Sequence, residues 1–133
     1  MSTIANGNPA VTQPASTSPS ADNDRRQFHR IHYPALERPW LFIGKQAYEV
    51  LDISVSGLRY IAPQTPIPNL HDQIQGALHF RHSGRHTKTP LQIQGTVVRT
   101  QDHEIAIHFN KEIPFNVLLA EQQYLRKHYP MWS

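Results

Sequence analysis

The sequence predicts an all-β domain that is closed at its C-terminal end by one helix. Short segments in which apolar and polar residues alternate recur at roughly ten-residue spacing, which is typical of short antiparallel strands. Turn-forming residues separate these segments, and the last segment changes to a period of three to four residues. Six such strands followed by one amphipathic helix favour a small antiparallel barrel or sandwich capped by a helix.

Each predicted strand is rich in apolar, β-branched or aromatic residues. The six strands are expected at residues 40–43, 46–53, 58–62, 74–80, 91–97 and 105–109. Gly44 and Lys45 separate the first two strands and predict a hairpin. Gly95 lies inside the fifth strand, where a glycine indicates a bulge or a close approach of two backbones.

The last segment has the spacing of an amphipathic helix. Its apolar positions are Phe115, Leu118, Leu119 and Leu125. Pro114 is compatible with a first helical turn, and residues 126–128 are basic, so they complement the dipole at the helix C-terminus. Pro130 is expected to end the helix.

Residues 1–23 differ in composition from the rest of the chain. They are rich in Ser, Thr, Pro, Ala and Asn, and they show no helical or strand periodicity. Such a segment cannot bury enough apolar surface to offset the entropy lost on ordering, so we expect it to be disordered. The alternative is an arm that folds on contact with a partner. The folded domain is then expected at residues 24–133, which is an ordinary size for one domain.

Composition excludes several classes of function. The net charge of +3 admits an anionic partner, but it is too small for a protein that coats duplex DNA. The chain has no cysteine, which excludes disulfides, thiol catalysis and cysteine-ligated metals. No apolar run approaches the ~20 residues that span a bilayer, and no signal-peptide pattern precedes Arg25. We therefore expect a cytoplasmic protein without membrane contact.

Three arginines, Arg25, Arg26 and Arg30, lie at the start of the predicted domain. In an extended or bent loop their guanidinium groups can converge on one anion. The guanidinium fork suits phosphate oxygens and also the O6 and N7 atoms of guanine. Taken alone, the three arginines favour a solvated basic loop.

A second polar segment, Asp52–Gly57, follows the second predicted strand. Asp52 is an acceptor suited to the N1–H and N2–H₂ donors of guanine, and Ser54 can hydrogen-bond a phosphate or a base. Gly57 permits a positive φ and lets a ligand approach the backbone. An Asx or ST turn that closes a hairpin explains the same residues structurally. The two segments together indicate a ligand that carries both phosphates and guanine edges.

The two segments resemble the signature motifs of PilZ domains. Residues 26–30 read Arg-Gln-Phe-His-Arg and match the motif RxxxR, and residues 52–57 read Asp-Ile-Ser-Val-Ser-Gly and match (D/N)xSxxG. The similarity extends over about residues 24–129, with looser matches at 95–99 and 104–109. In the last of these, Ala106 and Ile107 stand where the family commonly has a glycine.

The resemblance implies a six-stranded β-barrel that binds cyclic di-GMP and needs no other cofactor. Arg26 and Arg30 would hold guanine and phosphate, while Asp52, Ser54 and Gly57 would form the opposite wall. The arm that carries the arginines would close over the ligand and alter a surface for a protein partner that the sequence does not identify.

An arginine directly before the RxxxR motif, here Arg25, accompanies binding of an intercalated pair of cyclic di-GMP molecules in the family.

Two other functions are compatible with parts of the sequence. Mild positive charge and strand aromatics suggest a barrel for single-stranded nucleic acid, although Tyr48, Tyr60, Phe80 and Phe109 are more often core residues at strand spacing. A PilZ-like domain that acts only through protein contacts is a further alternative.

Neither catalysis nor metal binding is expected from the sequence. No histidine is placed by sequence to activate Ser54, and the nucleophile-elbow and P-loop motifs are absent. The histidines around the predicted turn at Ser83 and Gly84 are not expected to form a metal site, because His79 and His82 on one strand would point to opposite faces.

Overall fold

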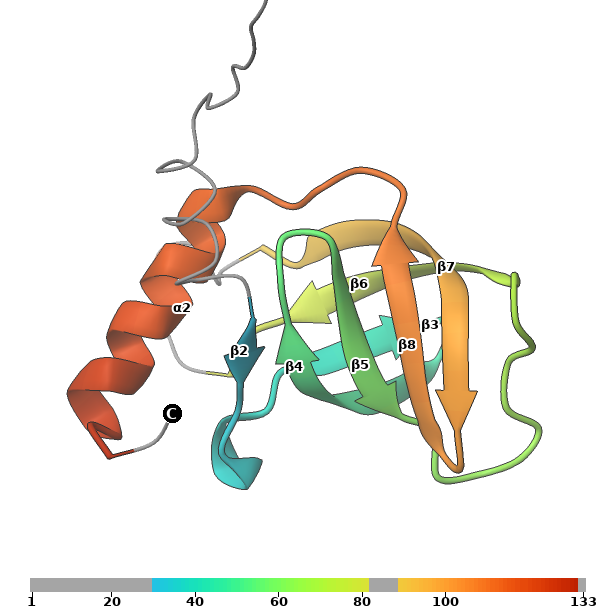
Figure 1. Cartoon of the computed structure of the whole chain (residues 1–133), viewed down its shortest axis with the longest axis horizontal. Helices are drawn as coiled ribbons and strands as arrows, with labels where there is room; N and C mark the ends of the chain where they lie inside the picture. Colours follow the sequence, from blue (N-terminus) through green and yellow to red (C-terminus); the bar gives the residue numbers. More distant parts are fainter. Residues whose placement is uncertain (1–29, 82–88, 132–133) are drawn as a thin grey trace, which may run out of the picture.

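The computed structural model describes residues 30–81 and 89–131. Within these residues, seven strands form one sheet in the order β2-β4-β3-β6-β7-β8-β5, and the additional pairing of β4 with β5 closes the six longer strands into a barrel. All the pairings are antiparallel (Figure 1). The elements are β2 Ile31–His32, β3 Trp40–Ile43, β4 Gln46–Ile53, β5 Gly57–Ile61, β6 Gln73–His79, β7 Leu91–Gln101, β8 Glu104–Phe109 and α2 Phe115–His128, with a 3₁₀ turn at Ala35–Glu37. The barrel and the terminal helix are therefore confirmed.

Alternate residues of each strand fill the barrel interior. Its fully or almost fully buried side chains include Leu41, Val50, Tyr60, Leu78, Val97 and Ile105. Helix α2 adds Leu118 and Leu125 to the same cluster, as its periodicity predicted, whereas Phe115 from the predicted apolar face is exposed. Phe80 and Phe109 are also buried, and Tyr48 packs against this core with its ring 5.3 Å from that of Tyr60. These aromatics are thus core residues and do not form an exposed platform for stacking bases.

The predicted strand positions agree with the structure, with two differences. Strand β7 continues to Gln101, beyond the predicted end, because a register shift between Val97 and Arg99 lets its pairing with β8 resume. Strand β2 and the 3₁₀ turn were not predicted, since two or three residues are too few to show a periodicity.

Two glycines have the roles that the sequence suggested. Gly44 has a φ of 61° in the β3–β4 hairpin, where glycine adopts the left-handed conformation without strain. A Cβ at Gly95 would lie 2.7 Å from the carbonyl oxygen of His108, so the glycine permits a close approach of β7 and β8.

Helix α2 is attached to the segment that follows β2. Figure 1 shows β2 between α2 and β4. The hydroxyl of Tyr33 donates a 2.7 Å hydrogen bond to Glu121, which is 1% exposed, and the hydroxyl of Tyr129 donates one of 2.7 Å to Glu37. Burial and the neighbouring Glu121 carboxylate raise the pKa of Tyr33 well above its usual value. A displacement of β2 would therefore disturb the contacts that hold α2.

Two structural predictions, the disordered tail at 1–23 and the turn at Ser83 and Gly84, concern residues outside the described ranges, as do the site predictions for Arg25 and Arg26. Among the helices of residues 30–81 and 89–131, none has the length and apolar character needed to cross a membrane.

Candidate ligand-binding site

The centre of the candidate site is the Asp52 carboxylate near the end of β4. It is fully buried, and both of its oxygens accept hydrogen bonds from arginines. Arg30 Nη1 lies 2.5 Å from Oδ1, while Arg59 places Nε 2.8 Å and Nη2 2.5 Å from Oδ2. His32 Nδ1 is 3.5 Å from Oδ2. Pairing of this kind is what a buried carboxylate requires.

Strand register brings these side chains together. His32 on β2 and Arg59 on β5 each lie opposite Asp52, from the two sides of β4. Directly opposed residues of antiparallel strands project from the same face of the sheet. Arg30 comes immediately before β2 and so reaches the same carboxylate.

Alternating charges continue beyond Asp52. Arg59 uses its remaining terminal nitrogen, Nη1, to bind Glu104 Oε1 at 2.7 Å on the adjacent strand β8. The hydrogen bonds from Arg59 to Asp52 raise the pKa of the guanidinium above its usual value. The resulting order is Arg30, Asp52, Arg59, Glu104, in which Arg59 has every nitrogen bonded.

Ser54 lies in the turn between β4 and β5 and is almost fully buried. Its Oγ donates to the carbonyl of Gly57 at 3.3 Å and accepts from the N–H of Ser56 at 3.3 Å, and its own N–H donates to the Gly57 carbonyl at 2.8 Å. The structural role predicted for this segment, a turn that closes a hairpin, is therefore present. In this conformation Ser56, rather than Ser54, lines the neighbouring pocket.

Gly57 does not have the positive φ that the sequence suggested, so that expectation was wrong. It is the first residue of β5 and pairs with His108 of β8. A Cβ at this position would collide with the carbonyl oxygen of Ile107. The glycine is thus required by the close approach of β5 and β8, and it also leaves an open wall in the pocket.

These residues line a surface pocket of about 470 Å³. Among the described residues, its lining includes three arginines, Arg30, Arg59 and Arg99, and one carboxylate, that of Asp52. Within the described part of the chain, Arg99 has no hydrogen-bond or ion-pair partner, and Arg30 uses only Nη1. The pocket therefore presents unused guanidinium donors, which suit phosphate oxygens or guanine acceptors.

The structure brings together four of the six predicted site residues: Arg30, Asp52, Ser54 and Gly57. Arg25 and Arg26 lie outside the described residues. Arg59 and Arg99 were missed. Arg59 is two residues after Gly57 and so shares its face of β5, a signal that the sequence did contain. Arg99 follows the register shift in β7, which hides its orientation.

The described residues show neither a catalytic set nor a metal centre. The side-chain partners of Ser54 are Ser56 and Gly57, so no base contacts its hydroxyl within this part of the chain. Across the same residues, no group of three His, Cys, Asp or Glu side chains is arranged to hold a metal ion.

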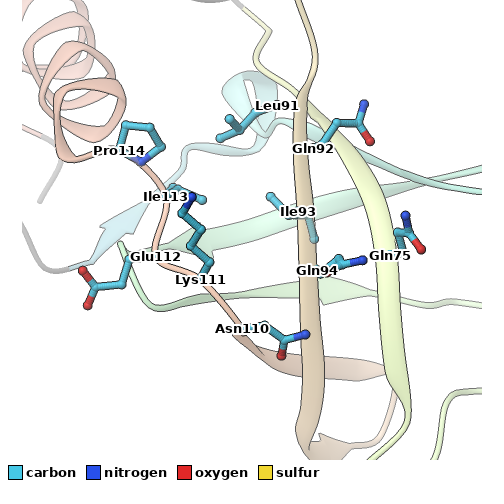
Figure 2. A pocket seen from close by; sticks show the side chains of 10 residues that line it. All are labelled: Gln75, Leu91, Gln92, Ile93, Gln94, Asn110, Lys111, Glu112, Ile113 and Pro114. Atoms are coloured by element: carbon cyan, nitrogen blue, oxygen red, sulfur yellow. The ribbon is translucent and has the colours of Figure 1, made fainter.

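A second pocket of about 470 Å³ lies between the start of β7 and the segment before α2 (Figure 2). Figure 2 shows Gln75, Gln92 and Gln94 pointing away from that segment. Among the described residues of its lining, the charged ones are Lys111 and Glu112, which have opposite charges, and none is an arginine. It is less suited to a doubly charged anion than the pocket at Asp52.

The sequence model of the PilZ domain matches residues 24–126. The crystal structure of an uncharacterized Legionella protein is similar with a TM-score of 0.50 at 21% identity, and the match covers 74% of this chain and 95% of that chain. At this identity the likeness is one of fold alone. Curated protein sequences gave no significant match.

Proposed function

Because this chain belongs to the PilZ domain family, we propose that it is a receptor for cyclic di-GMP that acts as an adaptor and catalyses no reaction. The observation that carries the proposal is the buried Asp52 carboxylate held by Arg30 beside a pocket with further arginines. Guanidinium and carboxylate groups together can read both edges of a guanine.

Arg30 is suited to the ligand because its Nε and Nη2 are unused within the described residues. We assign it, with Arg26, to guanine and phosphate. Asp52 would accept the N1–H and N2–H₂ groups of guanine. Because Oδ1 is occupied by Arg30, binding then involves an exchange, in which Arg30 turns to the ligand and the base takes its place.

Gly57 would form the other wall of the proposed site, and Ser54 would support that wall from inside the β4–β5 turn. Ser54 keeps the β4–β5 turn closed, which holds Asp52 at the strand end. Gly57 has no side chain to cover the pocket, so a base can lie against the backbone of β5. Arg25 supports the binding of an intercalated ligand pair, since it adds a further cation to neutralise four phosphates in place of two.

The output of binding would be a change of surface. Ligand contacts would order Asp24–Arg30 against the barrel and so alter a surface for a protein partner. Arg30 immediately precedes β2, and Tyr33 ties the following residues to α2. A shift of Arg30 therefore has a path to the helix.

The proposal is tested by NMR spectra of the full chain with and without cyclic di-GMP. Saturable shifts are expected for Asp52, Gly57 and Arg99, together with new dispersed signals from Asp24–Arg30. Cyclic di-AMP is the matched control, because it carries the same phosphates without a guanine. Equal shifts with both ligands, or none with cyclic di-GMP, would refute the proposal.

A further inference from the structure

Arg59 lies in neither sequence motif, yet it makes more contacts with Asp52 than Arg30 does. It bonds Oδ2 through two nitrogens and is fixed on its other side by Glu104. Arg30 bonds only Oδ1, through one nitrogen. The two arginines therefore divide the carboxylate between them, one oxygen each.

Because of this division, Asp52 would keep one arginine partner when Arg30 turns to a ligand. A buried carboxylate that lost its partners would be strongly destabilised. Arg59 stays on Oδ2, because its strand β5 is paired with β4 and β8 and because Glu104 binds its Nη1. Oδ1 is then left free, with its position set by the Asp52–Arg59 pair.

We propose that Arg59 is a specificity-determining positioning residue, which holds Asp52 so that Oδ1 meets the N1–H and 2-amino groups of a purine base. This inference rests on the proposed function. The ligand chemistry that it selects is a 2-amino-6-oxopurine, as opposed to a 6-oxopurine without the amino group. Phosphate contacts and the O6 and N7 contacts remain with the other arginines and do not depend on Arg59.

Arg59 is expected to affect recognition of the 2-amino group but not the affinity that comes from phosphate, O6 and N7. Loss of Arg59 removes the constraint on Asp52, so that its carboxylate can follow Arg30 or rotate away from the base. The 2-amino group then loses an acceptor, while the contacts with phosphate, O6 and N7 persist. A merely structural role of Arg59 would weaken all cyclic dinucleotides equally.

The test is calorimetric titration of the full chain with cyclic di-GMP and cyclic di-IMP, whose hypoxanthine bases lack the 2-amino group. The wild type is expected to prefer cyclic di-GMP by about tenfold or more, the value of one charge-assisted hydrogen bond. Arg59→Gln should bring the two dissociation constants to within about twofold of each other. Arg38→Gln is the matched control, since it removes an arginine from an ion pair with Glu49 away from the pocket, and it should keep the wild-type preference.

Arg59→Lys is the second variant, in case Arg59→Gln does not fold. It keeps the charge beside Asp52 but lacks the fork that bonds Oδ2 and Glu104 together. Its preference for cyclic di-GMP should also fall. A folded Arg59→Gln or Arg59→Lys chain with the wild-type preference would overturn the inference alone. Absence of binding of either dinucleotide to the wild type would instead overturn the proposed function on which it rests.

Discussion

Tyr33 and Glu121 are 88 residues apart in the sequence and form a buried hydrogen bond of 2.7 Å. The bond connects the segment after Arg30 with the middle of α2, the final element of the domain. Glu121 is almost fully buried on a helix whose other buried residues are leucines. This contact therefore joins the candidate site, through β2, to the helix that caps the barrel.

Replacement of Tyr33 by phenylalanine should destabilise the domain. The buried Glu121 would lose a hydrogen-bond donor, which costs about 1–3 kcal/mol. Urea denaturation of Tyr33→Phe measures this loss, and Tyr129→Phe, which removes the less buried bond to Glu37, should have a smaller effect. Adding Glu121→Leu to Tyr33→Phe should recover part of the stability. If Tyr33 and Glu121 were not coupled, the effects of the two substitutions would add. A double variant whose loss of stability equals the sum of the two single losses would therefore contradict the coupling.

Stability should fall at alkaline pH because the folded chain holds two tyrosine protons tightly. Burial and Glu121 raise the pKa of Tyr33, and burial raises the pKa of Tyr60 to about 12. In the unfolded chain both ionise near pH ~10. The stabilisation that these two tyrosines contribute is therefore complete below about pH 10, and it is lost as the pH rises toward their pKa values in the folded chain. Urea denaturation from about pH 8 to about pH 11 should show a weaker decline for Tyr33→Phe than for the wild type. Identical slopes would argue against the raised pKa of Tyr33.

Gly57→Ala should reduce stability as well as ligand binding. Its Cβ would collide with the Ile107 carbonyl oxygen, so β5 and β8 must separate, at about 1–3 kcal/mol. Thermal or urea denaturation gives the loss. Gly44→Asn is the control. Asparagine tolerates the positive φ of this residue, and a Cβ placed there would have no atom of a described residue within 4 Å, apart from its chain neighbours. Wild-type stability of Gly57→Ala would contradict the tight strand contact.

Arg26→Ala and Arg30→Ala should each weaken cyclic di-GMP binding by about 1.5–3 kcal/mol, the range for a hydrogen bond to a charged group. Arg59 keeps Asp52 paired in Arg30→Ala, so this variant is expected to remain folded. Calorimetry on both variants measures the change, with Arg38→Ala as the control for loss of one positive charge. Wild-type affinity in both would show that the site is assigned to the wrong residues.

The strands and the helix could be predicted from the sequence because each carries a repeated pattern over several residues. Strand β2 could not, although its two residues place Arg30 beside Asp52. The conformation of Gly57 could not be predicted either. The composition of residues 52–57 suggests that Gly57 is a turn residue, whereas Ser54 closes the turn and Gly57 already belongs to β5.

Of the two arginine partners of Asp52, Arg30 lies in a motif, whereas the spacing of Arg59 from Gly57 indicates only a shared face of β5 and not a contact with Asp52. Arg59 meets this carboxylate only after a register shift between Val50 and Asp52 in the β4–β5 pairing, and no local pattern reveals such a shift. The burial of Glu121 could not be predicted from the sequence either, because its hydrogen-bond partner Tyr33 lies 88 residues away. Motif residues could thus be found from sequence, while the residues that orient them required the fold.

Titration of the wild-type chain with cyclic di-GMP by calorimetry tests the central claim most directly. Saturable binding at micromolar ligand is the predicted result. A single-stranded oligonucleotide should fail to displace the ligand, because the aromatic residues Tyr60, Phe80 and Phe109 are buried in the barrel. The absence of saturable binding at micromolar cyclic di-GMP, or its displacement by an oligonucleotide with a steep salt dependence, would contradict the account.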